Sequence, residues 1–326
     1  MKLFVDQEPL MLENGTTVNG LTIAYHTYGT LSRDKDNVVW ICHALTGDSD
    51  AALWWRGLVG PGCPIDTERL FVVCANMIGS CYGSTEFSDA MGMVVTTRDQ
   101  VRAFIRLRQH LQLPQIRLLI GGSMGGQHVL EWAVHEPAVI ERIVPIATNA
   151  RHLPWVVASN AAQRMAIEAD STFYTPRPGA GAAGLAAARA MAMIMYRTPL
   201  QYSLTQQPED ERISTYPSES YQRHQGRKLV ERFTARAYYV LTRSMDSHDL
   251  GRGRGGAGAV LRSISAQTLS IGIDSDLLFP ESEQQFIADM VPRGQYRRLL
   301  SSAGHDAFLI HTERLATILH KSGIIP

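Results

Sequence analysis

The sequence predicts an α/β fold, with a mostly parallel sheet flanked by helices and a helical segment inserted into it. Three observations support this prediction. Short apolar runs alternate with helical patterns up to about residue 150, residues 151–245 indicate helices but no convincing strand, and the alternation returns after residue 245. A repeated strand, helix, strand order requires crossover connections, which place parallel strands in one sheet. We therefore expect a core formed by residues 1–150 and 246–326, and a lid formed by residues 151–245.

The individual elements follow from the periodicity of apolar residues. The continuous apolar run 116–120 suits a strand buried on both faces. Apolar residues at helical spacing between residues 97 and 111 predict a helix, which Pro114 terminates. The other expected strands are residues 21–25, 38–42, 70–75, 140–147, 268–273 and 296–300. The other expected helices of the core are residues 124–135, 281–290 and 307–320.

The composition indicates a globular protein and excludes several classes of function. Of 326 residues 45% are hydrophobic, and 31 basic side chains balance 31 acidic ones. Balanced charge gives no electrostatic footprint for nucleic acid or for an anionic membrane surface. The sequence has no run of 18 apolar residues that would predict a membrane-spanning helix, and its N-terminus lacks the apolar stretch of a secretory signal. The four cysteines lack CxxC spacing, so we expect no metal site. A cytoplasmic enzyme is the resulting expectation.

The strongest local motif is Gly121-Gly122-Ser123-Met124-Gly125-Gly126, which fits G-x-S-x-G between a buried strand and a helix. Glycines allow the tight turn that holds such a serine strained, with its oxygen projecting above the sheet. The helix N-terminus behind the serine places backbone N–H groups near a developing oxyanion. Ser123 is therefore the predicted nucleophile.

A nucleophilic serine needs a histidine base, and the base needs an orienting acid. In chain order after Ser123, Asp274 and Asp276 follow the strand that ends at Ile273, and His305 follows the last expected strand. The carboxyl ends of the strands are where such a sheet presents its active-site loops. The spacing predicts His305 as the base and leaves both aspartates as candidates for the acid.

Two other features carry weaker signals. His43 follows an early strand, where this kind of fold places its second backbone oxyanion donor, and we expect its ring only to shape that loop. The glycine-rich and basic stretch 249–256 lacks the G-x-G-x-x-G spacing of a dinucleotide loop. We expect this stretch to be a solvated connection.

Beyond these motifs the sequence resembles the homoserine O-acyltransferases of methionine biosynthesis, specifically the homoserine O-acetyltransferase type on the α/β-hydrolase fold. The resemblance extends from residue 40 to the C-terminus. The segments that carry it are residues 43–47, 59–62, 64–67, 76–85, 121–126, 131–132, 246–256, 275–280 and 304–306.

The resemblance implies a role for each matching residue. Ser123 resembles the acyl-accepting nucleophile, Asp276 rather than Asp274 the orienting acid, and His305 the base. The backbone amides of Leu45 and Met124 would stabilise the oxyanion. Three residues match the substrate-binding positions: Asp306 for the ammonium group of homoserine, and Arg232, with Tyr238 close by, for its carboxylate. The family also implies a homodimer.

The implied reaction is transfer of an acetyl group from acetyl-CoA to the side-chain hydroxyl of L-homoserine through an acyl-serine, with no metal or prosthetic group. The sequence departs from the pattern common in this family at two places, which the resemblance puts near the acyl and acceptor pockets. Glu86-Phe87 stands where the family commonly has Gly-Pro, and Thr234-Ala235-Arg236 stands where it commonly has Asp-Ala-Asn. The alternatives are succinyl-CoA as donor, L-serine as acceptor, a plain serine esterase or thioesterase, and a non-catalytic binding protein. The intact order of serine, aspartate and histidine argues against the last of these.

Overall fold

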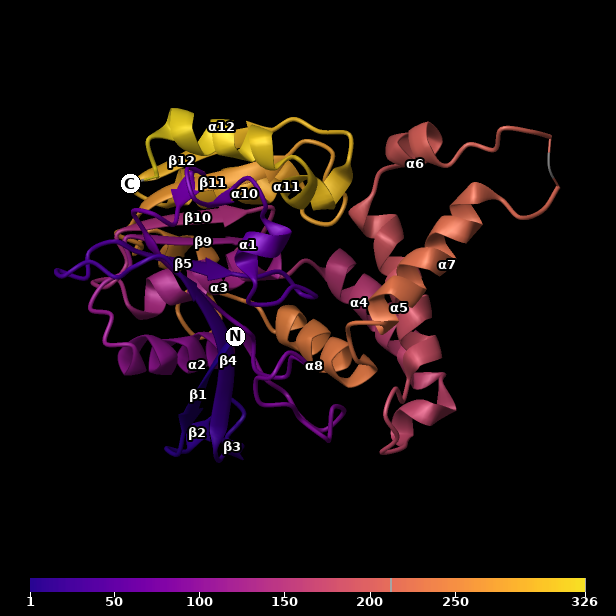
Figure 1. Cartoon of the computed structure of the whole chain (residues 1–326), viewed down its shortest axis with the longest axis horizontal. Coiled ribbons are helices and arrows are strands. Elements are labelled where there is room, and N and C mark those ends of the chain that lie inside the picture. Colours follow the sequence, from indigo (N-terminus) through magenta and orange to yellow (C-terminus); the bar gives the residue numbers. More distant parts are fainter. Residues whose placement is uncertain (212, 326) are drawn as a thin grey trace.

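Eight strands form one sheet at the centre of the computed structural model, which describes residues 1–211 and 213–325 (Figure 1). The strand order is β1-β4-β8-β5-β9-β10-β11-β12. β4 pairs antiparallel with β1 and β8, and every later neighbour is parallel. The strands of this sheet are β1 (Lys2–Asp6), β4 (Leu21–Tyr28), β5 (Val38–Cys42), β8 (Phe71–Ala75), β9 (Leu118–Gly122), β10 (Arg142–Ile146), β11 (Gln267–Ile273) and β12 (Gly294–Leu299). Two short pairs lie outside it: β2 (Leu10–Met11) with β3 (Thr17–Val18), and β6 (Val59–Gly60) with β7 (Ile65–Asp66).

Helices cover both faces of the sheet, and each face has its own apolar core. Alternate residues of β5 point to opposite sides, so Trp40 packs in one core and Ile41 in the other. The Trp40 core includes residues of α2 (Thr97–His110), α3 (Met124–His135), α9 (Ala257–Leu261) and α10 (Glu281–Met290). The Ile41 core includes residues of α1 (Ala51–Trp54), α11 (Ala307–Ile310) and α12 (Thr312–Ser322). The predicted parallel α/β fold is confirmed.

The helical insertion is confirmed as well. The chain between β10 and β11 forms α4 (Pro154–Glu168), α5 (Ala182–Tyr196), α6 (Pro199–Thr205), α7 (Pro217–Val230) and α8 (Ala235–Asp246), with a short 3-10 turn at Ser171–Tyr174. Figure 1 shows α4 to α7 beside the sheet and α8 between them and the core. The chain enters and leaves this region at one place, because Arg151 and Asp249 form an antiparallel bridge.

A few elements differ from the prediction. The strand expected at residues 116–120 begins at Leu118, and Ile116 forms only an isolated bridge with Ile140. The helix expected at residues 307–320 is interrupted at His311, whose φ of −101° and ψ of 56° are not helical. β1 was not predicted, because an edge strand with exposed Leu3 and Val5 lacks a clean apolar alternation. Within the described residues, no helix is both long and apolar enough to cross a membrane.

Candidate active site

Ser123 lies in a sharp turn between β9 and α3, as the G-x-S-x-G motif predicts. Its φ of 58° is unusual for a residue with a side chain. Gly125 allows the helix to approach the neighbouring strand, because a Cβ on it would lie 2.1 Å from the carbonyl oxygen of Cys42. A Cβ on Gly122 would meet the ring of Phe308 at 2.3 Å. Both glycines are therefore required by close packing around the serine.

Two backbone amides near Ser123 are candidates for an oxyanion site, those of Met124 and Leu45. Met124 is the first residue of α3, and the first four amides of a helix have no acceptor within it. Leu45 belongs to the loop after β5 and lines the same cavity as Ser123. His43 shapes that loop: its Nδ1 lies 2.9 Å from the Ala44 carbonyl oxygen, and its Nε2 accepts the Met77 amide at 3.3 Å. Burial lowers the pKa of His43, so the ring is neutral.

The structure brings His305 and Asp276 together and leaves Asp274 aside. His305 Nδ1 lies 2.7 Å from Asp276 Oδ2, and the other oxygen of Asp276 accepts the amides of Leu278 and Phe279 at 2.8 and 3.0 Å. Asp274 instead accepts the Ser301 amide at 2.9 Å. Burial alone would lower the pKa of His305, but the adjacent Asp276 carboxylate stabilises the imidazolium and raises this pKa above its ordinary value.

Ser123 and His305 line one cavity of about 470 Å³. Its wall comes from the loop after β5, from α1, from α11 and from the lid. The charged side chains that line it are Asp48, Arg189, Lys228, Arg232 and Asp306. A zwitterionic ligand could therefore be met by both signs of charge beside the serine.

The predicted substrate-binding residues do not all reach this cavity. Arg232 lines it, and its Nη1 donates to the Thr46 carbonyl and, at 3.0 Å, to the Tyr82 hydroxyl. Asp306 also lines it and forms an ion pair with Arg197 at 3.2 Å. Tyr238 is fully buried and is not a lining residue; its hydroxyl donates to Gln163 at 2.5 Å.

Sequence reasoning missed three residues: Arg189 in the middle of α5, Tyr196 at its last position and Arg197 directly after it. The ring of Tyr196 lies 5.6 Å from that of His305 and lines the cavity. Burial raises the pKa of Tyr196, so its hydroxyl stays protonated. No motif marks these residues; the only local signal is Thr198-Pro199, which caps α6 and shows that α5 ends before it.

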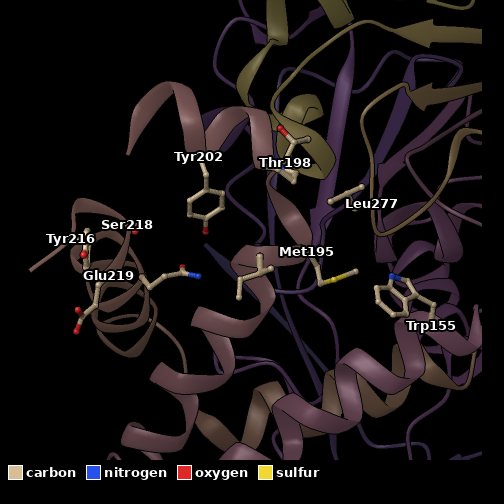
Figure 2. Close-up of a pocket in the computed structure, with 11 residues that line it drawn as sticks. Trp155, Met195, Thr198, Tyr202, Tyr216, Ser218, Glu219 and Leu277 are labelled. Carbon is tan, nitrogen blue, oxygen red and sulfur yellow. The ribbon is translucent and has the colours of Figure 1, made fainter. Parts of the chain in front are cut away.

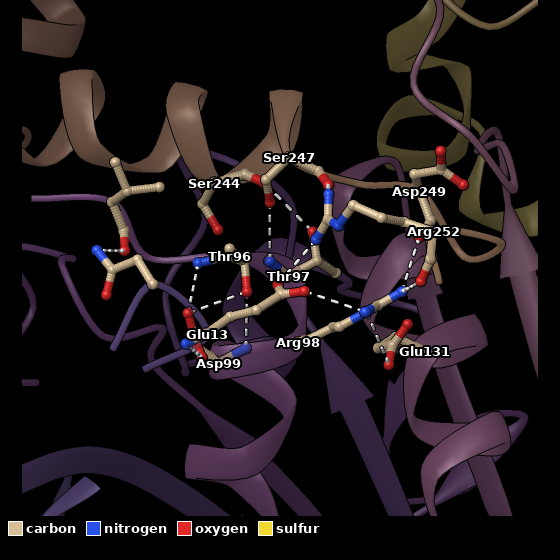
Figure 3. A network of polar contacts seen from close by, with 12 residues as sticks. Glu13, Thr96, Thr97, Arg98, Asp99, Glu131, Ser244, Ser247, Asp249 and Arg252 are labelled. Atoms are coloured by element: carbon tan, nitrogen blue, oxygen red, sulfur yellow. Dashed lines mark hydrogen bonds and ion pairs between the residues drawn. The ribbon is translucent and has the colours of Figure 1, made fainter. Parts of the chain in front are cut away.

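The basic stretch 249–256 is not a solvated connection, contrary to expectation. Arg254 makes two hydrogen bonds to the Glu131 carboxylate on α3, at 2.9 and 2.7 Å. Figure 3 shows the adjoining network, in which Arg98 contacts Glu13 and the carbonyl oxygen of Asp249, while Arg252 pairs with Glu13. The stretch thus connects the C-terminal end of the helical insertion to α3 and to the N-terminal segment. Within the described part of the chain, no group of three or more His, Cys, Asp and Glu side chains could hold a metal ion.

The mostly parallel sheet, the sharp turn at Ser123 and the contact between His305 and Asp276 together define a protein of the α/β-hydrolase fold. A family profile described as alpha/beta hydrolase fold matches residues 37–312. Solved structures agree: an esterase E22 variant superposes with a TM-score of 0.91 at 21% identity, covering 100% of this chain and 99% of its own. At that identity the likeness shows the fold alone.

Closer relatives define the family. The homoserine O-acetyltransferase of Cyclobacterium marinum is 44% identical over 98% of this chain and 93% of its own length. That of Salinibacter ruber is 43% identical over 94% and 93%. The crystal structure of the Staphylococcus aureus homoserine O-acetyltransferase superposes with a TM-score of 0.82 at 26% identity, covering 98% of this chain and 95% of that one. This chain belongs to the homoserine O-acetyltransferase family.

Proposed function

We propose that the protein transfers an acetyl group from acetyl-CoA to the side-chain hydroxyl of L-homoserine, as a step of methionine biosynthesis in the cytoplasm. The observation that carries this proposal is the 44% identity to a homoserine O-acetyltransferase over nearly the full length of both chains. The cavity beside Ser123 supports it, since side chains of both signs lie within reach of an amino-acid acceptor.

The proposed mechanism has two halves. His305 takes the proton of the Ser123 hydroxyl, and the serine oxygen attacks the thioester carbonyl. The amides of Leu45 and Met124 stabilise the oxyanion. The thiolate of CoA leaves with the proton from His305, and an acetyl-serine remains. His305 then deprotonates the homoserine hydroxyl, whose oxygen attacks the acetyl-serine carbonyl. The bond to the serine oxygen breaks, and His305 returns the proton to that oxygen, which regenerates the free Ser123.

The lid, residues 151–245, has two proposed tasks in this mechanism, while residues 1–150 and 246–326 form the catalytic core. It walls the cavity with residues of α5 and α7, which limits the access of water to the acetyl-serine. It also supplies Arg232 for the carboxylate of homoserine, whereas Asp306 of the core meets the ammonium group. A guanidinium suits a carboxylate because its donors form a planar fork.

We also propose that the protein forms a homodimer through the lid. A second cavity of about 890 Å³ opens among α4, α5, α6 and α7 and contains neither Ser123 nor His305. Figure 2 shows Trp155, Met195, Tyr202 and Leu277 around it. Trp155 and Ile194 are 62% and 59% exposed, which is a large apolar surface for a single chain. A second copy would cover it.

The alternative functions differ in donor, acceptor or outcome. Succinyl-CoA or L-serine would need the same nucleophile. A plain esterase or thioesterase would use the same serine, histidine and aspartate. Water rather than homoserine would then accept the acyl group.

A CoA-release assay tests the proposal. Enzyme mixed with acetyl-CoA alone should release about one CoA per site in a burst, with slow hydrolysis afterwards. Homoserine should then restore rapid turnover and yield O-acetylhomoserine, whereas serine and succinyl-CoA should not. Mass spectrometry should find the acetyl group on the peptide that carries Ser123, and Ser123→Ala should abolish the burst. Equal hydrolysis with and without homoserine would identify an esterase.

A further inference from the structure

Arg189 lines the cavity that contains Ser123, and among the described residues its guanidinium has neither an anionic nor a hydrogen-bonding partner. It lies on α5 and is half-buried, and its guanidinium lies over the ring of Tyr196, 5.4 Å from the ring centroid. Removing a charge partly from water without a partner is costly. A ligand that brings an anionic group into the cavity would offset that cost.

Other enclosed arginines of this chain show the contrast. Arg108 pairs with Glu136 at 2.8 Å, Arg164 with Asp246 at 2.7 Å, and Arg254 with Glu131 at 2.7 Å. In the cavity itself, Arg232 already donates to the carbonyl oxygen of Thr46 and to the hydroxyl of Tyr82. Arg189 thus retains all the donors of its guanidinium for a ligand.

The acids of the cavity do not serve Arg189. Asp306 pairs with Arg197, and the Asp48 carboxylate accepts the Asp50 amide at 2.8 Å. The ring of Tyr196 is a neighbour of both residues: its centroid lies 5.4 Å from the Arg189 guanidinium carbon and 5.6 Å from the centroid of the His305 ring. An amino acid whose hydroxyl reaches His305 would therefore extend along Tyr196 toward Arg189.

We propose that Arg189 is a second carboxylate-binding residue for the amino-acid acceptor, acting together with Arg232. This inference rests on the proposed function, because it requires a zwitterionic acceptor. Two guanidiniums that line one cavity repel each other, and a carboxylate between them removes that repulsion. The acceptor would then be selected by its carboxylate as well as by its hydroxyl.

The test compares two acceptors that differ only in the carboxylate. 3-Amino-1-propanol is homoserine without its carboxylate, with the hydroxyl and ammonium groups retained. In Arg189→Met, kcat/KM for homoserine should fall about ten- to a hundredfold, whereas kcat/KM for 3-amino-1-propanol and the acetyl-CoA burst should stay near wild type. The preference for homoserine should therefore collapse. Arg227→Met is the matched control, since it removes an exposed cation of α7 that does not line this cavity and should leave the preference intact.

Each other outcome overturns the proposal. An equal loss with both acceptors would make Arg189 a structural residue, and a lost burst would assign it to the donor. If the preference for homoserine over 3-amino-1-propanol were lost in Arg232→Met but kept in Arg189→Met, Arg189 would not bind the carboxylate. If Arg189→Met does not fold, Arg189→Lys is the second variant, because lysine keeps the positive charge but lacks the planar guanidinium. Its ratio of kcat/KM for homoserine to kcat/KM for 3-amino-1-propanol should lie between the wild-type ratio and about one tenth of it or less, the loss expected for Arg189→Met. A wild-type enzyme that acetylates Ser123 yet transfers nothing to homoserine would refute the proposed function instead.

Discussion

The contact between His305 and Asp276 determines how activity should depend on pH. His305 can accept the serine proton only in its neutral form, and Asp276 raises the pKa of the imidazole against the opposing effect of burial. Activity should therefore be lost as pH falls through a pKa above the ordinary histidine value. By linkage, the protonated ring stabilises the fold at low pH, and this contribution disappears as pH rises through the same pKa.

Asp276→Asn should change both the rate and its pH profile. The acylation rate should fall about a thousandfold or more. Burial then acts on His305 without the carboxylate, so the acid limb of the remaining activity should move to lower pH. Single-turnover acylation of Ser123, followed by mass spectrometry across pH, measures both effects. An acid limb that stays in place would mean that another group controls it; Asp274→Asn is the matched control, because Asp274 contacts the Ser301 amide instead.

Asp306 and Arg232 should matter only in the second half of the reaction. Asp306→Asn or Arg232→Ala should lower the rate of acetyl transfer to homoserine about ten- to a hundredfold, since each loses a charge-assisted contact of roughly 1.5–3 kcal/mol. The acetyl-CoA burst should survive in both variants. Stopped-flow detection of CoA, with and without homoserine, separates the two halves; loss of the burst would place the residue in acylation or folding.

Sequence reasoning reached some of these residues and missed others for a physical reason. Ser123 lies in a local motif, and His305 and Asp276 follow strands whose order the pattern reveals. Arg189 and Tyr196 reach the cavity only because the lid folds over the sheet, and no local pattern connects Tyr196 with His305. Tyr238 was expected near the carboxylate, yet its helical position turns it into the interior toward Gln163.

At the scale of elements, the Arg254–Glu131 ion pair joins the loop after α8 to α3. The Glu131 side chain is only 1% exposed, and its ion-pair partners are Arg254 at 2.7 Å and Arg98 at 3.8 Å. Arg254→Met should lower the free energy of unfolding by about 3 kcal/mol, because it leaves a buried carboxylate nearly unpaired. Urea unfolding followed by circular dichroism measures this loss.

A second substitution checks the cause of that loss. Arg254→Met combined with Glu131→Gln should recover much of the stability, since the buried charge is removed as well. Arg223→Met is the control: it breaks an exposed pair with Glu219 on α7 and should cost less than about 1 kcal/mol. Equal instability of the single and double variants would show that packing, and not charge, stabilises this contact.

Strand and helix prediction succeeded for elements that are buried almost throughout, such as β5 and α3, because a continuous apolar run or a local motif marks them. It failed at β1, where only Phe4 is buried, and at His311, where the backbone leaves the helix for one residue. β1 is positioned by its antiparallel pairing with β4, which its own residues do not reveal. Local pattern therefore describes the centre of this sheet better than its edge.

At the scale of the whole molecule, the exposed apolar cavity of the lid should determine the oligomeric state. Ile194→Asp should convert a dimer to a monomer, because it places a charge in a surface that a second copy would bury. Light scattering after size-exclusion chromatography gives the mass. Leu3→Asp, a substitution of an equally exposed apolar residue on the edge strand, should leave the dimer intact. A monomeric wild-type protein would refute the proposed interface.

The lid is fastened to the histidine loop by several contacts. Thr198 donates to the Ser302 carbonyl at 2.6 Å, Arg197 pairs with Asp306, and a Cβ on Gly304 would lie 2.8 Å from the Tyr196 carbonyl oxygen. Because these contacts join the lid to the loop that carries His305, a displacement of the lid would also displace His305. In the proposed mechanism, donor and acceptor would therefore occupy the same cavity in turn. Excess homoserine would then occupy the unacetylated enzyme and compete with acetyl-CoA. When both substrates saturate the enzyme, the flux through it would accordingly fall as the ratio of homoserine to acetyl-CoA rises.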